Sequence, residues 1–124
     1  MPLIERFEDI QGWQEARILT KMVYALTSKE LFGKDFGLKD QIRRASVSVM
    51  ANIAEGFDCD SDIEFARFLG IARRSAVEVQ SLLYAALDLN YITQQELDIH
   101  YEQARKAKAL VGGFKRSLLK KHTT

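Results

Sequence analysis

Residues 37–57, GLKDQIRRASVSVMANIAEGF, decide the fold of this chain. The segment has no proline, and no glycine between Leu38 and Glu55, so it predicts one uninterrupted helix. At about 100° per residue, one narrow face collects Leu38, Ile42, Ala45, Val49, Ile53 and Gly56. This stripe predicts that the helix packs into a hydrophobic core.

The same helix carries two further bands beside its core stripe. One band is wholly polar and consists of Gln41, Arg44, Ser48, Asn52 and Glu55. Two interpretations of it stay open, a hydrogen-bond network between helices and a binding surface. The other band is apolar and consists of Val47, Met50, Ala51 and Ala54. A monomer would leave this second apolar face in water, so the band predicts a contact with another molecule.

Three more helices are predicted, at about 12–28, 61–89 and 93–119. The helix at 12–28 has a core stripe and again a second apolar band, Ile18, Met22 and Ala25. The helices at 61–89 and 93–119 each begin with the pattern of a capping box, SDIE and TQQE. The pair Gly112-Gly113 inside the last helix predicts close packing of another backbone.

These segments define an all-α fold. Short connections between long amphipathic helices, without β-like alternation, predict an antiparallel up-down-up-down four-helix bundle. We expect residues 29–37 to form a loop, and Asn90 and Tyr91 to turn the chain. A length of 124 residues fits a single domain, 1–124, with an N-terminal lead at 1–11 and a basic tail at 120–124.

The composition is that of a soluble globular protein, with 47% hydrophobic and 28% charged residues. A formal net charge of +1 gives no whole-molecule reason to expect a nucleic acid or a membrane. Charge is uneven along the chain, however, because residues 55–64 contain five acids and no base, whereas residues 103–124 contain seven bases and no acid. The single cysteine, Cys59, and the lack of an apolar run near the ~20 residues of a membrane span predict a cytoplasmic protein without a membrane contact.

Four stretches resemble a known family. They are GLxxQxRRAxxSxxANIAEG over residues 37–56, WQxA at 13–16, EFxRFLxIAxxSxxE at 64–78, and NYI at 90–92. Together they resemble the signature of a bacterial four-helix-bundle family named after proteins encoded in intervening sequences of large-subunit ribosomal RNA genes. Two positions depart from the pattern: Met50 stands where proline is common, and Arg74 where glycine is common. The first departure should straighten the helix at 38–57.

This resemblance implies a homo-oligomer, with a ring-shaped pentamer as the favoured assembly, and the bands at 18–25 and 47–54 as its candidate interface. Related accessory proteins of diversity-generating retroelements bind nucleic acid. The resemblance brings no established activity, and the ribosomal naming is no evidence of a ribosomal role.

Two functions from different classes remain. The first is binding of RNA or DNA through a basic surface assembled across subunits, with these candidate residues: Arg43, Arg67, Arg73, Arg74, Lys115, Arg116, Lys120 and Lys121. The alternative is a scaffold that binds another protein, in which case the same bases are solvated helix faces or complement a helix dipole. Clustering of the bases on one surface favours the first function, and dispersal beside acids favours the second.

Enzyme classes are disfavoured. A di-iron bundle needs Glu-x-x-His on two helices, and neither His100 nor His122 lies three residues after a glutamate. Cys59 lies among acids, which oppose a reactive thiolate. There is no glycine-rich phosphate loop and no serine nucleophile motif. We therefore expect no catalytic residue, no metal and no cofactor.

Overall fold

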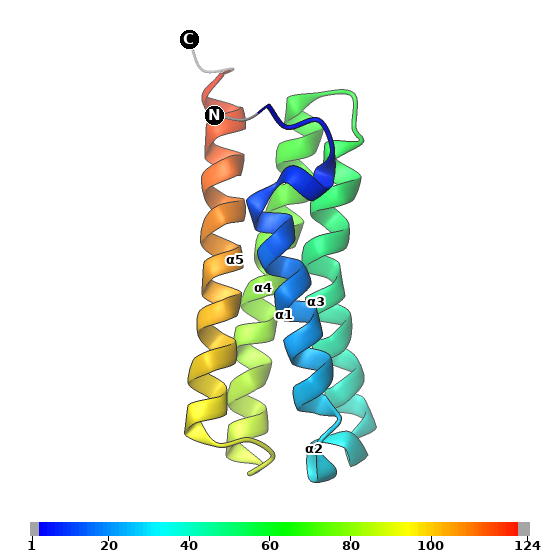
Figure 1. The fold of residues 1–124 in the computed structure, drawn as a ribbon, viewed down its shortest axis with the longest axis vertical. Coiled ribbons are helices and arrows are strands. Elements are labelled where there is room, and N and C mark those ends of the chain that lie inside the picture. Colours follow the sequence, from blue (N-terminus) through cyan, green and yellow to red (C-terminus); the bar gives the residue numbers. More distant parts are fainter. Residues whose placement is uncertain (1–2, 122–124) are drawn as a thin grey trace.

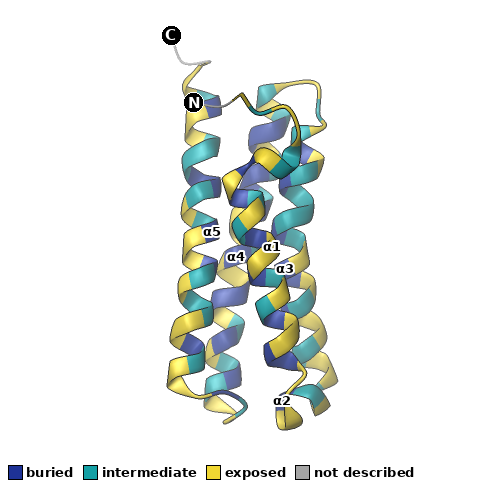
Figure 2. Cartoon of the chain, viewed as in Figure 1, coloured by how far each residue is buried: buried dark blue, intermediate teal, exposed yellow. Residues whose placement is uncertain are grey.

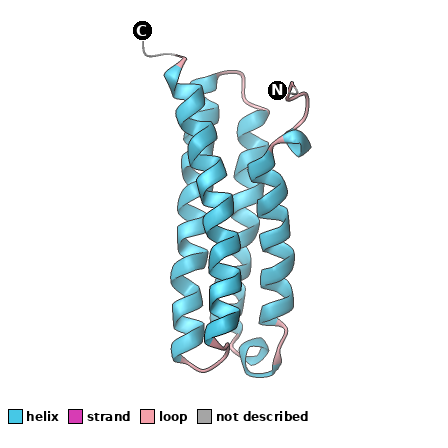
Figure 3. Ribbon diagram, turned by 60° about the vertical axis from the view of Figure 1, so that its left-hand side comes forward, coloured by secondary structure: helices cyan, strands magenta, loops and turns pink. Residues whose placement is uncertain are grey.

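The structure, a computed structural model, describes residues 3–121, and within them all regular secondary structure is helical (Figure 3). The elements are η1 (Phe7–Asp9), α1 (Gln11–Thr27), α2 (Glu30–Lys34), α3 (Phe36–Phe57), α4 (Asp62–Asp88) and α5 (Gln94–Lys120). Residues 1–2 of the predicted lead and 122–124 of the predicted basic tail lie outside the described residues. The prediction of an all-α antiparallel four-helix bundle is confirmed. Within the described part, no helix is long and apolar enough to cross a membrane.

The four long helices form a closed ring of neighbours (Figure 1). Helix α1 packs beside α3 and α5, and α4 packs beside the same two helices. Consecutive long helices run in opposite directions, as the predicted topology requires. The bundle therefore has two opposite surfaces, the α1/α3 flank and the α4/α5 flank.

The core fills the inside of this ring along its whole length (Figure 2). The stripe predicted on the helix at 38–57 is the inner face of α3, where Ile42, Val49 and Ile53 are fully buried. One core cluster around Ile42 occupies the end of the bundle near α2, and another around Ile53 occupies the end near η1. Ile10 of the lead is buried in the second cluster. Helical periodicity alone therefore located the core.

The predicted loop at 29–37 is where the fold differs from the prediction, because it contains the short helix α2. Phe32 is fully buried in the core and holds this helix in place. Lys29, just before α2, forms an ion pair with Glu96 at the start of α5. Asp35 then starts α3 two residues earlier than predicted, because its Oδ1 accepts a hydrogen bond from the Leu38 amide at 3.1 Å.

One of the two predicted capping boxes is complete. At the start of α5, Thr93 Oγ1 accepts from the Glu96 amide at 3.1 Å, and the Glu96 carboxylate accepts from the Thr93 amide at 2.9 Å. At the start of α4, Ser61 Oγ accepts from the Glu64 amide at 3.1 Å, but the Glu64 carboxylate binds Arg67 instead of closing the box. The turn before α5 is as predicted, with Asn90 at φ 61°, a left-handed conformation that asparagine tolerates.

Candidate nucleic-acid interface

Two arginines converge where α4 and α5 pack together. A Cβ added to Gly112 on α5 would lie 3.4 Å from Nη1 of Arg116 and 3.7 Å from Nε of Arg73 on α4. One turn away, a Cβ added to Gly70 on α4 would lie 2.9 Å from Nζ of Lys115. The glycines therefore leave room for long basic side chains to lie against the neighbouring helix. The expectation that Gly112 admits another backbone is wrong, because these side chains occupy the space.

The bases at this place lack acidic partners. Arg73, Arg74, Lys115 and Arg116, which we call the basic surface, form no ion pair with any residue that the structure describes. Six other bases each pair with a carboxylate elsewhere on the molecule. The reason lies in the sequence: α4 has no acid at 65–77, and α5 has none after Glu102. Like charges held together without a counter-charge attract anions.

Lys108 extends the basic surface along the groove between α4 and α5. Its Nζ donates a hydrogen bond to Oε1 of Gln80 at 3.3 Å. Gln80 is only 5% exposed, and its Nε2 has no hydrogen-bond partner among the described residues. Lys108 was not among the predicted candidate residues, although its place in the acid-free run at 103–124 was the signal that could have found it.

Arg43 does not join the other predicted bases. It lies on the α1/α3 flank, where its guanidinium stacks 4.4 Å from the ring centre of Tyr24. Its Nε donates to Thr27 Oγ1 at 2.7 Å, and its Nη2 donates to Ser28 Oγ at 3.1 Å. These contacts commit the side chain to holding α3 against α1.

Arg67 is also engaged, although it lies on α4. Its Nε and Nη2 both donate to the Glu64 carboxylate, at distances from 2.9 to 3.1 Å. Hydrogen bonding to Arg67, more than the attraction of its charge, lowers the pKa of Glu64. Lys120 ends α5 and Lys121 follows it, both exposed. The structure thus brings three of the eight predicted bases together, Arg73, Lys115 and Arg116, and leaves Arg74 exposed next to Arg73 on α4. Two bases lie at the end of α5, and the remaining two are engaged by other side chains of the protein.

The polar band of α3 divides into three parts. Its centre is half-buried against α4: Ser48 Oγ lies 2.8 Å from Ser75 Oγ, and Asn52 Nδ2 donates to Ser48 Oγ at 2.9 Å. Towards α2, Gln41 donates to Glu78 on α4 at 3.2 Å. The other two members are exposed: Arg44 forms an ion pair with Asp40, and Glu55 has no side-chain partner among the described residues. The band is therefore partly an interhelical network and partly free surface.

The two predicted apolar bands lie on neighbouring helices, the first on α1 and the second on α3. Ile18 follows Glu15 by three residues and so shares its face, and Glu15 Oε1 accepts from Gln103 on α5 at 2.9 Å. On the other side, Thr20 approaches Met50 of α3 at 3.5 Å. All seven band members are exposed or half-buried: Ile18, Met22, Ala25, Val47, Met50, Ala51 and Ala54. They form two separate patches and not one surface.

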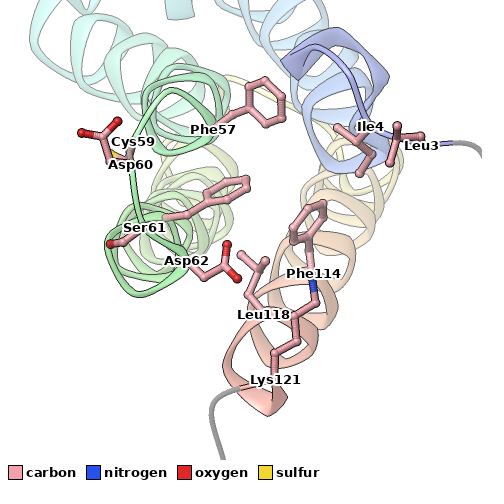
Figure 4. A pocket seen from close by; sticks show the side chains of 11 residues that line it. Leu3, Ile4, Phe57, Cys59, Asp60, Ser61, Asp62, Phe114, Leu118 and Lys121 are labelled. Carbon is pink, nitrogen blue, oxygen red and sulfur yellow. The ribbon is translucent and has the colours of Figure 1, made fainter.

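A pocket of about 510 Å³ opens at the η1 end of the bundle (Figure 4). The rings of Phe57 and Phe114 and the side chain of Ile4 face the hollow, whereas Cys59 lies at its outer edge. The Cys59 thiol donates to the carbonyl oxygen of Glu55 one turn earlier, at 3.5 Å. Among the described residues, no three histidine, cysteine or acidic side chains are grouped so that they could hold a metal ion.

Comparisons with known proteins agree with this architecture. The model of the 23S rRNA-intervening sequence protein family matches residues 8–113. Among solved structures, the chain is similar to a protein of unknown function from the S23 ribosomal protein family of Bacteroides thetaiotaomicron, with a TM-score of 0.77 and 22% sequence identity. The superposition covers 84% of this chain and 97% of that chain. No curated protein matches the sequence.

Proposed function

The chain belongs to the 23S rRNA-intervening sequence protein family, and we propose that it is a non-enzymatic homo-oligomer that binds nucleic acid through the α4/α5 flank. The observation that carries this proposal is the basic surface, where Arg73, Arg74, Lys115 and Arg116 have no carboxylate partner among the described residues. The phosphate backbone of RNA or DNA supplies the negative charge that this surface lacks.

Oligomerisation makes four bases sufficient. A single chain has a net charge of only +1, so one copy holds a nucleic acid weakly. Repetition of the basic surface in every subunit adds phosphate contacts, and each contact releases counterions. Support for the assembly comes from the two exposed apolar patches around Ile18 and Val47, which water solvates poorly. The family resemblance favours a ring of five subunits.

Binding is tested by fluorescence anisotropy with labelled RNA and DNA of unrelated sequences at salt concentrations from about 50 to 200 mM. We expect binding that does not depend on sequence. The logarithm of the binding constant should fall linearly with the logarithm of the salt concentration, with a slope of about −0.7 per phosphate contact for single strands. Light scattering on the same samples measures the oligomeric state. A monomer at micromolar concentration would contradict the assembly.

The double variant Arg73→Ala/Arg116→Ala should lose affinity and lower the salt slope while the oligomer stays intact. A matched control, Arg6→Ala/Arg44→Ala, removes the same charge from bases that pair with Glu8 and Asp40. It should leave binding nearly unchanged. If the intact oligomer binds neither RNA nor DNA at the lowest salt, the nucleic-acid function is wrong and the protein-scaffold alternative stands.

A further inference from the structure

A half-exposed tyrosine lies on the same groove as the basic surface. Tyr84 on α4 is 50% exposed, and its ring packs against Tyr101 on α5 with the ring centres 5.9 Å apart. Arg73 and Tyr84 are eleven residues apart, about three full turns, so the two side chains leave α4 in nearly the same direction. The positive charge of Arg73 and the aromatic ring of Tyr84 therefore lie along the same side of the α4/α5 groove.

We propose, on the premise that the basic surface binds phosphates, that the ligand is a single-stranded nucleic acid and that Tyr84 stacks on one of its bases. A charged track combined with an aromatic platform is how proteins hold single strands without reading sequence, because every base has a face on which a ring can stack. In a duplex the bases are already stacked on one another, so Tyr84 would gain nothing from it.

The distance between Arg73 and Tyr84 sets how long a bound strand must be. Eleven residues of helix span about 16 Å, so a strand that contacts both side chains must extend over about that length. Between the two ends lie Val77, an exposed apolar side chain on the same line, and Lys108 on the facing helix. A strand whose phosphates contact Arg73 and Lys108 therefore reaches Tyr84 within a few nucleotides.

The geometry of the tyrosine pair leaves Tyr84 free to stack. Its ring meets Tyr101 at 75° between planes, so the two rings are not stacked face to face, and Tyr84 stays 50% exposed. Beyond this point the surface turns acidic, since Asp88 lies one turn further along α4 and Asp98 lies on α5 before Tyr101. Of these, Asp98 accepts a hydrogen bond from Gln94. The acids repel phosphate and so mark Tyr84 as the end of the strand's path.

The test compares one labelled RNA of about 12 nucleotides, alone and annealed to its complement, by fluorescence anisotropy at several salt concentrations. The wild-type oligomer should bind the single strand at least about tenfold more tightly than the duplex. Tyr84→Ala should weaken binding of the single strand about 5- to 100-fold, while Tyr84→Phe, which keeps the ring, stays within about twofold of wild type. Tyr24→Ala on the α1/α3 flank is the matched control, because Tyr24 is 41% exposed but lies far from the basic surface.

The salt slope separates stacking from phosphate contact. Tyr84→Ala should lower affinity equally at all salt concentrations, because stacking releases no counterions, whereas Arg73→Ala/Arg116→Ala should reduce the slope. Equal affinity for strand and duplex, or wild-type binding by a folded Tyr84→Ala protein, would overturn the inference and leave the proposed function intact. Tyr84→Leu repeats this test in a variant that keeps the apolar contact with Tyr101. Failure of wild-type protein to bind either RNA would overturn the proposed function itself.

Discussion

The α1/α3 flank and the α4/α5 flank carry the same residue types in opposite arrangements. On the α1/α3 flank, Arg43 covers the ring of Tyr24 at 4.4 Å and donates to Thr27 at 2.7 Å. On the α4/α5 flank, Arg73 lies about three turns from Tyr84 and has no ion-pair partner in the described part of the chain. Arg43 in contact with Tyr24 stabilises the packing of α3 against α1. Arg73 and Tyr84 do not contact each other, so both side chains stay available to a ligand.

The energies of the contacts indicate how much each flank contributes to the stability of the fold. Hydrogen bonds from a charged group stabilise a fold by about 1.5–3 kcal/mol, and a cation–π contact at an exposed site adds about 0.5–1 kcal/mol. Arg43 makes both kinds of contact. The basic surface makes neither with the described residues, and its like charges repel one another. The first flank should therefore govern stability and the second should govern binding.

The largest effect is expected from the core beneath both flanks. Ile53 is fully buried between them, so Ile53→Ala should lower the free energy of unfolding by about 2–5 kcal/mol. Urea denaturation followed by circular dichroism measures the loss. Ile63→Ala is the control, because Ile63 is exposed on α4 and its loss should change stability by less than about 0.5 kcal/mol. A loss below about 1 kcal/mol for Ile53→Ala would mean that the core is misplaced.

A smaller effect should separate the two flanks directly. Arg43→Ala should lower the free energy of unfolding by about 1–3 kcal/mol, since it removes the contacts to Tyr24, Thr27 and Ser28, and should leave RNA affinity unchanged. Arg73→Ala should change stability by less than about 0.5 kcal/mol and weaken RNA binding. Denaturation curves and anisotropy titrations of both variants give the four values. The reverse pattern would show that the roles of the flanks are exchanged.

The smallest effect concerns acid. The pKa of Glu96 is lowered, first by the hydrogen bond from Lys29 and then by the amide of Thr93. A carboxyl group whose pKa is lower in the folded state contributes stability above its unfolded value of about 4.3 and loses it as the pH falls through the folded value. The wild-type protein should therefore lose stability between about pH 5 and pH 3 more steeply than Glu96→Gln.

Two controls connect this acid sensitivity to the comparison of flanks. Glu55→Gln should keep the wild-type pH curve, because Glu55 is exposed and its carboxylate has no partner among the described residues. Arg73→Ala should keep it too, because the basic surface involves no carboxylate that could be protonated. Thermal melts at several pH values measure all four proteins. A shallower curve for Arg73→Ala would reveal an acidic partner for Arg73.

Much of the fold follows from local pattern. The stripe on α3, the Thr93 cap and the turn at Asn90 were all predicted, because each depends on residues within one or two helical turns of each other. Helix α2 was missed for the opposite reason. Five residues do not sustain a helix by themselves, and α2 exists because Phe32 is buried among residues of other helices.

The candidate site was predicted only in part. The bases of the acid-free runs were visible in the sequence, and three of them, Arg73, Lys115 and Arg116, do lie together on α4 and α5. Arg43 and Arg73 look equivalent as members of arginine pairs on amphipathic helices. Tyr84 was not predicted as a site residue, although its spacing of eleven residues from Arg73 was present in the sequence.

The sequence by itself therefore determined which residues share a helix face and where most helices begin and end. A helix repeats every 3.6 residues whatever surrounds it, so these properties are local. The tertiary structure alone decided that Arg43 has partners on another helix. Tyr24 lies 19 residues before Arg43 in sequence and is brought to it only because α1 packs beside α3. The distance between a charged side chain and a partner on another helix depends on which helices are neighbours and on their register. The local helical repeat encodes neither of these two properties.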